Sequence, residues 1–156
     1  MFERLLLLKQ VPLKPDLGLL LLRIFAFTFL FLKHGAIDLS TFGALSHSFD
    51  DPIHIGHLPT LVLATLSDAI CAVLIIVGLA TRWAALYTFF VHFVAFAFVL
   101  HFTFISRHVP NGEKLLLYIG AGLALYFLGA GKYSVDAMIQ GSREAKQASR
   151  GATLAA

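Results

Sequence analysis

Four long apolar runs constrain this chain more than any other feature of its sequence. They cover about residues 17–32, 58–80, 83–104 and 114–129. An α-helix needs about 20 residues to cross ~30 Å of hydrocarbon at 1.5 Å per residue. In hydrocarbon every backbone amide must be paired within its own segment, which favours helices over strands. The runs therefore predict an all-α fold, an integral membrane four-helix bundle.

The composition also indicates an apolar solvent. Of the 156 residues, 58% are hydrophobic and 13% are charged, against roughly 45–50% and about 25% in soluble domains. A chain this short cannot hide that excess in one core. The positive charge lies in tails and loop ends, as is typical of membrane proteins, so we expect contact with membrane lipid and no nucleic-acid partner. Cys71 is the only cysteine, which excludes an internal disulfide and a CxxC redox pair.

Lysine and arginine are distributed unevenly between the two ends of the predicted bundle. Eight lie on the side of the two termini and of the tight second loop, and three lie on the other side, namely Lys33, Arg107 and Lys114. The positive-inside rule then predicts that both termini are cytoplasmic. The chain divides into one transmembrane domain over residues 1–140 and a small, polar C-terminal tail over residues 141–156, which is predicted to be disordered.

Three ionisable side chains fall near the middle of the apolar runs: Arg23, Asp68 and His92. Ionisable groups inside a membrane are expensive, at a few kcal/mol each or more. The matching depths of Arg23 and Asp68 predict an ion pair, since each charge would otherwise be unpaired in a low dielectric. One interpretation is a polar centre for a redox ligand or a proton. The other is a structural clamp that fixes the helix register, which is the commoner use of such a pair.

Helical spacing extends this polar centre toward the outer surface. Arg23 and His34 are eleven residues apart, as are Asp68 and His57, so each pair shares one helix face. The predicted outer mouth gathers four polar side chains: His34, His57, His101 and Glu113. Such groups can bind a transition metal or a haem, or exchange protons near pH 7. No tight ligand motif accompanies them, so no metal site is predicted and a haem is not favoured.

The run over 83–104 carries seven phenylalanines. An aromatic wall of this kind can stack the ring of a quinone, the obvious planar substrate carried in lipid. Phenylalanines in such a run more often face lipid or fill the bundle.

Several short motifs resemble the DoxX family of small four-helix bacterial membrane proteins. They follow one another in the order Leu22-Arg23, His34-Gly35, Gly78-Leu79-Ala80-Thr81-Arg82, Asn111-Gly112-Glu113 and Gly129 to Asp136. The family takes its name from a subunit of a membrane thiosulfate:quinone oxidoreductase, and its relatives are associated with thiol and oxidative-stress metabolism. The resemblance implies a multi-pass protein of the bacterial plasma (inner) membrane that works with a soluble or membrane redox partner. Asp68 stands where the family usually has glutamate.

Two functions from different classes follow. The first is a membrane subunit linked to quinone or thiol redox metabolism, either non-catalytic or quinone-binding, with any electrons supplied by a partner or a bound cofactor. The second is a non-enzymatic scaffold or small-solute permease, in which the polar side chains serve packing or transport. Whether the chain is itself catalytic, and whether it forms a homo-oligomer, is left open by the sequence.

Overall fold

The computed structural model describes residues 14–102 and 112–154, with side chains up to residue 150. The ends of the chain and residues 103–111, which include Arg107 and Asn111, lie outside the described residues. Within the described residues three helices are long and apolar enough to cross a membrane. They are Pro15–Ser40 with 26 residues, His57–Val77 with 21 and Thr81–Val99 with 19. We refer to them as the first, second and third spans.

Each span is a composite of α-helical and π-helical segments. The first span consists of α2 (Pro15–Leu30), η1 (Phe31–Gly35) and α3 (Ala36–Ser40). The second consists of α5 (His57–Thr65), η2 (Leu66–Cys71) and α6 (Ala72–Val77), and the third of α7 (Thr81–Val94) and η3 (Ala95–Val99). A short helix, α4 (Phe42–Leu45), lies between the first two spans, and α8 (Gly112–Leu128) and α9 (Val135–Leu154) follow the third.

The ends of these helices have identifiable causes. Pro15 begins α2, where its fixed φ suits the first turn and its missing N–H is not needed. Gly78 ends α6 in a left-handed conformation, with φ at 78°. Its N–H donates to the Leu74 carbonyl at 2.9 Å, and so does that of Leu79, also at 2.9 Å. This C-terminal capping turn leads the chain directly from α6 into α7.

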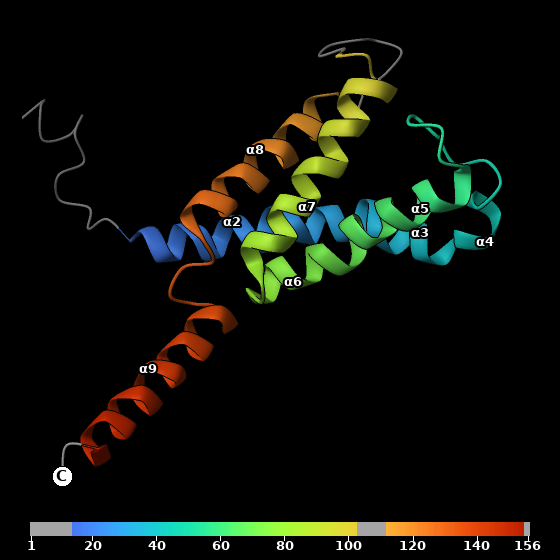
Figure 1. Ribbon diagram of the computed structural model, residues 1–156. Coiled ribbons are helices and arrows are strands. Elements are labelled where there is room, and N and C mark those ends of the chain that lie inside the picture. The colour runs from blue at the N-terminus through green and yellow to red at the C-terminus, as the bar shows by residue number, and fades with distance from the viewer. Residues whose placement is uncertain (1–13, 103–111, 155–156) are drawn as a thin grey trace, which may run out of the picture.

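The helices form two antiparallel pairs (Figure 1). In the first pair α2 contacts α6, η1 contacts η2 and α3 contacts α5, so the first two spans run in opposite directions. In the second pair α8 packs along α7 and reaches η3. The buried apolar core joins both pairs, because Phe27 and Leu30 of α2 meet Ile75 of α6, Ala85 of α7 and Leu125 of α8. The pairs diverge beyond this core (Figure 1).

Hydrogen bonds join the helix ends at the end of the molecule that lies away from the point where the two pairs diverge. We call this region the polar junction; it comprises Asp16, Arg23, residues 78–81 and residues 131–136. The Asp136 carboxylate accepts the backbone N–H of Ala80 at 2.8 Å and that of Thr81 at 2.9 Å. Asp16 accepts the backbone N–H of Lys132 at 2.9 Å. The start of α2, the turn between α6 and α7 and the segment after α8 are thereby held together.

The observed helix bounds differ from the predicted ones at two places. The first span continues to Ser40, well beyond the predicted end at residue 32. Residues 141–154, which the sequence predicts to be disordered, belong to helix α9. Alanine, glutamate, lysine, arginine and glutamine are strong helix formers, and Ser134 Oγ accepts the backbone N–H of Ala137 at 3.1 Å in the first turn. The helix projects away from the two pairs (Figure 1), with exposed side chains over most of its length.

Candidate functional site

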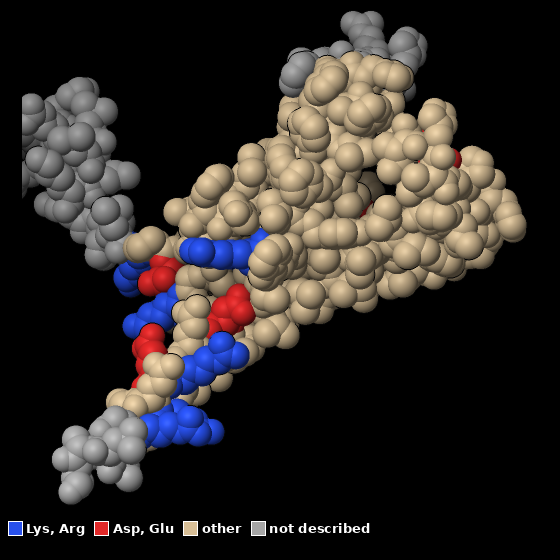
Figure 2. Space-filling model, viewed as in Figure 1, with Lys and Arg blue, Asp and Glu red and all other residues tan. Residues whose placement is uncertain are grey.

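A cavity of about 390 Å³ lies where the two helix pairs diverge. Its volume is in the range of small-molecule sites. The lining is mainly apolar, with side chains such as Leu63, Ala64, Val91 and Ala95, and the segment 49–53 borders it as well. The space-filling view shows a hollow on this face, with an acidic side chain visible inside it (Figure 2). Four of the lining side chains are aromatic and six are polar: Phe49, Tyr87, Phe90 and Tyr118, and His34, Asp50, Thr60, Asp68, His92 and Lys114.

All three spans change to π-helical geometry beside this cavity. His34 lies in η1 and Asp68 in η2, while η3 begins three residues after His92. The wider turn is seen in the N–H of Leu100, which donates to the carbonyl of Ala95, five residues earlier, at 3.1 Å. Segments of this kind are rare and frequently occur at functional sites. Their coincidence around one cavity marks it as the candidate functional site.

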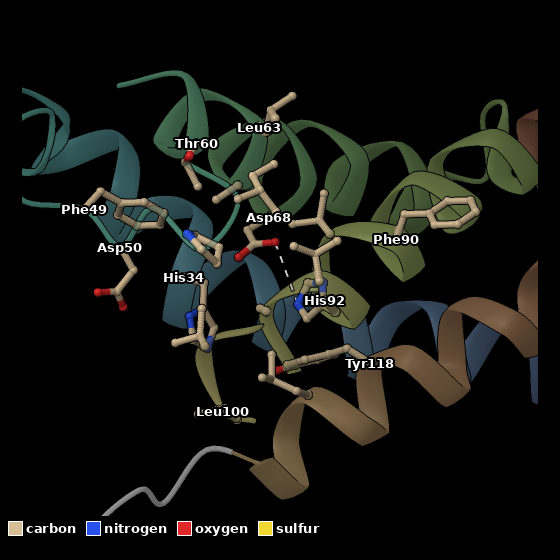
Figure 3. Close-up of a pocket in the computed structure, with 18 of the residues that line it drawn as sticks. His34, Phe49, Asp50, Thr60, Leu63, Asp68, Phe90, His92, Leu100 and Tyr118 are labelled. Carbon is tan, nitrogen blue, oxygen red and sulfur yellow. Dashed lines mark ion pairs between the residues drawn. The ribbon is translucent and has the colours of Figure 1, made fainter. Parts of the chain in front are cut away.

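Asp68 and His92 face each other across the helix interface (Figure 3). Asp68 Oδ1 lies 3.9 Å from His92 Nε2, and the two side chains are only 12% and 4% exposed. On its other side the His92 ring contacts the Thr88 carbonyl through Nδ1, at 2.9 Å. Asp68 Oδ1 is buried and has no hydrogen-bond partner. The pair therefore leaves one buried oxygen, Asp68 Oδ1, without a hydrogen-bond donor from the described residues, beside a largely apolar cavity.

Aromatic contacts hold the histidine rings around this pair. The Tyr118 ring stands edge-on to the His92 ring at 5.3 Å between centroids, and to the His34 ring at 6.5 Å. Figure 3 shows His34 beside Asp68, with Asp50 and Phe49 further from His92. Helix α8 thus positions two histidines from different spans through one tyrosine. Tyr118 is a cavity residue that the sequence reasoning missed, and the signal that could have found it is a phenol hydroxyl inside an apolar run.

Arg23 does not pair with Asp68, so the predicted ion pair is wrong. Arg23 is fully buried at the polar junction, where Nη2 donates to the Tyr133 carbonyl. Its Nη1 lies against Gly78, where an added Cβ would approach to 2.0 Å. The predicted equal depth is wrong, because the first span continues to Ser40. Arg23 lies beside Gly78 at the junction, whereas Asp68 lies beside Gly35, further along the first span. Of the predicted polar centre, the structure brings together Asp68 and His92 but not Arg23.

The four residues of the predicted outer mouth are dispersed. Only His34 lines the cavity. His57 is exposed and its Nδ1 contacts the Phe49 carbonyl. His101, with a positive φ of 46°, and Glu113 in the first turn of α8 are both exposed. Within the described ranges no three His, Cys, Asp or Glu side chains are close enough to share a metal ion.

The predicted phenylalanine wall contributes little to the cavity. Of the seven phenylalanines, Phe90 is the one in the described lining. Phe89 stacks on Phe93 at 5.8 Å instead, and Phe96 stands edge-on to Phe102 at 5.6 Å. The aromatic side chains of the cavity come from three different segments, namely the segment 49–53, α7 and α8, which the spacing within one helix could not indicate.

The segment 49–53 is positioned by Asp51. Its carboxylate accepts the backbone N–H groups of Ile55 at 3.0 Å and Gly56 at 2.8 Å, and the Thr60 hydroxyl at 3.0 Å. Desolvation acts against the charged form, but these hydrogen bonds outweigh it and keep the pKa of Asp51 below its usual 3.8. The bonds tie the loop to the start of α5 and so hold Phe49 and Asp50 at the border of the cavity.

Comparison with known proteins places the three spans in one family, apart from the first residues of the first span. The family model described as DoxX matches residues 18–101, more than half of the chain. The matched region contains His34, Asp68 and His92. Comparisons with curated proteins and with solved structures found no match. The chain therefore belongs to the DoxX family.

Proposed function

We propose that this protein is a multi-pass protein of the bacterial plasma membrane that binds a quinone in the cavity and serves as a membrane subunit in quinone or thiol redox metabolism. The observation that carries the proposal is the Asp68–His92 pair inside a largely apolar cavity of about 390 Å³. A quinone ring needs apolar and aromatic walls, here including Tyr87, Phe90 and Tyr118, and a few polar groups to orient its oxygens.

The proposed topology has α8 as a fourth span and both termini in the cytoplasm. Helix α8 has 17 residues, no acidic or basic residue after Lys114, and packs along α7 as far as η3. Basic side chains gather around α9 and the polar junction (Figure 2), among them Arg82, Lys132, Arg143 and Lys146. The positive-inside rule assigns such an end to the cytoplasm, and the cavity then lies toward the outer leaflet.

The chemistry divides between this chain and a partner. Reduction of a quinone to a quinol consumes two electrons and two protons. Asp68 and His92 can exchange protons with the ligand oxygens, since a carboxylate and an imidazole both accept and return protons. The chain has a single cysteine, Cys71, and it is buried. The electrons are therefore assigned to a partner protein that oxidises thiols to a disulfide or oxidises thiosulfate, two electrons at a time.

A pair of alanines on one helical segment offers a matched test. Ala95 lines the cavity, whereas Ala97, two residues on in η3, does not. Ala95→Leu fills part of the cavity and is expected to weaken binding of a short-chain benzoquinone by at least about tenfold, the equivalent of 1.4 kcal/mol. Ala97→Leu adds the same volume outside the cavity and should bind like the wild type. Binding is measured by isothermal titration calorimetry on the full chain in mild detergent.

Two results would overturn the proposal. One is absence of quinone binding by the wild-type protein, together with unchanged quinone reduction in membranes of a deletion strain. The other is equal loss of binding in both leucine variants, which would show that the quinone does not bind in the cavity. In the first case, impaired solute flux or impaired assembly in Asp68→Asn would favour the permease or scaffold instead.

A further inference from the structure

The hydrogen bond on the far side of His92 determines which of its nitrogens carries a proton. The Thr88 carbonyl oxygen can only accept, so His92 Nδ1, at 2.9 Å from it, must be the donor. In the neutral ring Nε2 is then an unprotonated acceptor. That nitrogen is the one directed at Asp68, at 3.9 Å from Oδ1.

Two acceptors consequently face each other when Asp68 is ionised and His92 is neutral. The separation of 3.9 Å is too long for a direct hydrogen bond, and Oδ1 has no other partner. Buried acceptors without donors are costly. Either one proton must join the pair, or an O–H or N–H group must reach it from outside the protein, from water in the cavity or from a bound ligand.

None of the other polar groups that the structure describes around the cavity is hydrogen-bonded to Asp68 Oδ1. The Tyr87 hydroxyl donates to the Leu63 carbonyl at 3.1 Å, and the Thr60 hydroxyl is bonded to Asp51. The imidazole of His34 and the hydroxyl of Tyr118 can each donate or accept, so neither favours one kind of ligand. The remaining groups that border the cavity or interact with Asp68 are Asp38, Asp50, Cys71, Lys114 and the hydroxyl of Ser67.

From this arrangement we propose that the Asp68–His92 pair distinguishes the two redox states of its ligand, so that a quinol binds the deprotonated pair and a quinone binds only when the pair holds one proton. This inference rests on the proposed function. A quinol carries two O–H donors, and one of them can make a charge-assisted hydrogen bond to the carboxylate. A quinone offers only carbonyl acceptors, which the deprotonated pair repels.

Quinone binding and quinol binding are expected to exchange different numbers of protons with solvent. At any pH the Asp68–His92 pair carries one more proton in the quinone complex than in the quinol complex. At a pH above the pKa of the free pair, quinone binding takes up one proton and quinol binding takes up none. At a pH below that pKa, quinone binding takes up none and quinol binding releases one. The quinone dissociation constant therefore rises by up to about tenfold per pH unit on the alkaline side.

The test is calorimetric titration of the full chain in detergent with a short-chain benzoquinone and, under anaerobic conditions, with its quinol. Titrations in buffers of different ionisation enthalpy give the number of protons exchanged, at several pH values. The expected difference between the two ligands is one proton at every pH. In Asp68→Asn the amide supplies a permanent donor, so the difference should fall to zero and quinone binding should lose its pH dependence. Glu144→Gln, which removes an exposed carboxylate of α9, should keep the difference of one.

The outcomes separate this inference from the function on which it rests. If neither ligand binds, the proposed function fails. If both bind with the same proton count in the wild type, the proposed function stands and the selection by redox state is wrong. A difference of one proton that persists in Asp68→Asn would assign the proton to another group and would also overturn the inference. The wild-type measurement decides even if Asp68→Asn does not fold.

Discussion

Gly35 is the residue whose replacement tests the packing of the site most severely. It lies in η1, next to His34, and is buried against η2. A Cβ added to it would come within 2.2 Å of the Asp68 carbonyl oxygen, 2.5 Å of its carbonyl carbon and 2.7 Å of the Ala69 nitrogen. All three atoms belong to the backbone, so no side-chain rotation can relieve the contact. The first two spans would have to separate.

The size of the effect follows from the distances. A carbon–oxygen contact needs roughly 3.3 Å, so the 2.2 Å approach requires a local separation of about 1 Å. Overpacking of this kind costs about 1–3 kcal/mol, and contact with backbone places Gly35→Ala at the upper end. Alanine regains up to about 1 kcal/mol of helix propensity. The net expectation is destabilisation by about 2 kcal/mol, with weaker quinone binding because His34 and Asp68 move apart.

The assay is unfolding of the purified full chain in mild detergent, with quinone titration on the same samples. Gly18→Ala and Gly120→Ala are matched controls, because a Cβ at either position meets nothing within 4 Å. Both should be neutral or slightly stabilised through the same gain in propensity. A Gly35→Ala variant as stable as these controls, with unchanged binding, would refute the close approach of η1 and η2.

Three further predictions concern the polar junction and the outer loop. Gly78→Ala combines a φ of 78° with a Cβ only 2.0 Å from Arg23 Nη1, and should lower the free energy of unfolding by about 3 kcal/mol in the same assay. In Asp136→Asn the amide has one acceptor oxygen for the two backbone N–H donors, so the free energy of unfolding should fall by about 1 kcal/mol. An unchanged stability would contradict the role of this carboxylate. Because hydrogen bonds hold the pKa of Asp51 below its usual 3.8, its contribution is present above that pH and is lost as the pH falls through the lower value. Hydrogen-exchange protection of residues 55–60 should fall in acid in the wild type and be low at every pH in Asp51→Asn, and equal profiles would contradict this role.

The membrane character of the chain could be predicted because it depends on composition and run length alone. The three candidate spans coincide with three of the four apolar runs to within a few residues, except where the first continues to Ser40. A run of apolar residues ends where polar residues begin, but a helix continues while its backbone bonds remain satisfied. The sequence therefore located the spans better than their ends.

The partners within the site could be predicted only in part. Asp68 and His92 were singled out because ionisable residues inside apolar runs are rare, and the structure joins them. Arg23 was singled out for the same reason but paired wrongly. The middle of the apolar run 17–32 was taken as the middle of the helix, but the span continues to Ser40, so Arg23 lies near one end of it and not at the level of Asp68. No sequence signal marked η1, η2 and η3.

The C-terminal segment illustrates a different limit. Small and polar residues suggested disorder, yet most of them are good helix formers and α9 extends from a capped start at Ser134. Composition that cannot build a core does not exclude a helix without one. The charged side chains of α9 remain the main support for the proposed orientation.

The most direct test of the central claim is a high-resolution structure of the full chain in lipid nanodiscs with a short-chain benzoquinone. We expect the ring in the cavity, with one oxygen within hydrogen-bond distance of Asp68 or His92 and a face against Tyr118 or Phe90. A structure in which the quinone lies only at the lipid-facing surface, while acyl chains fill the cavity, would contradict the account.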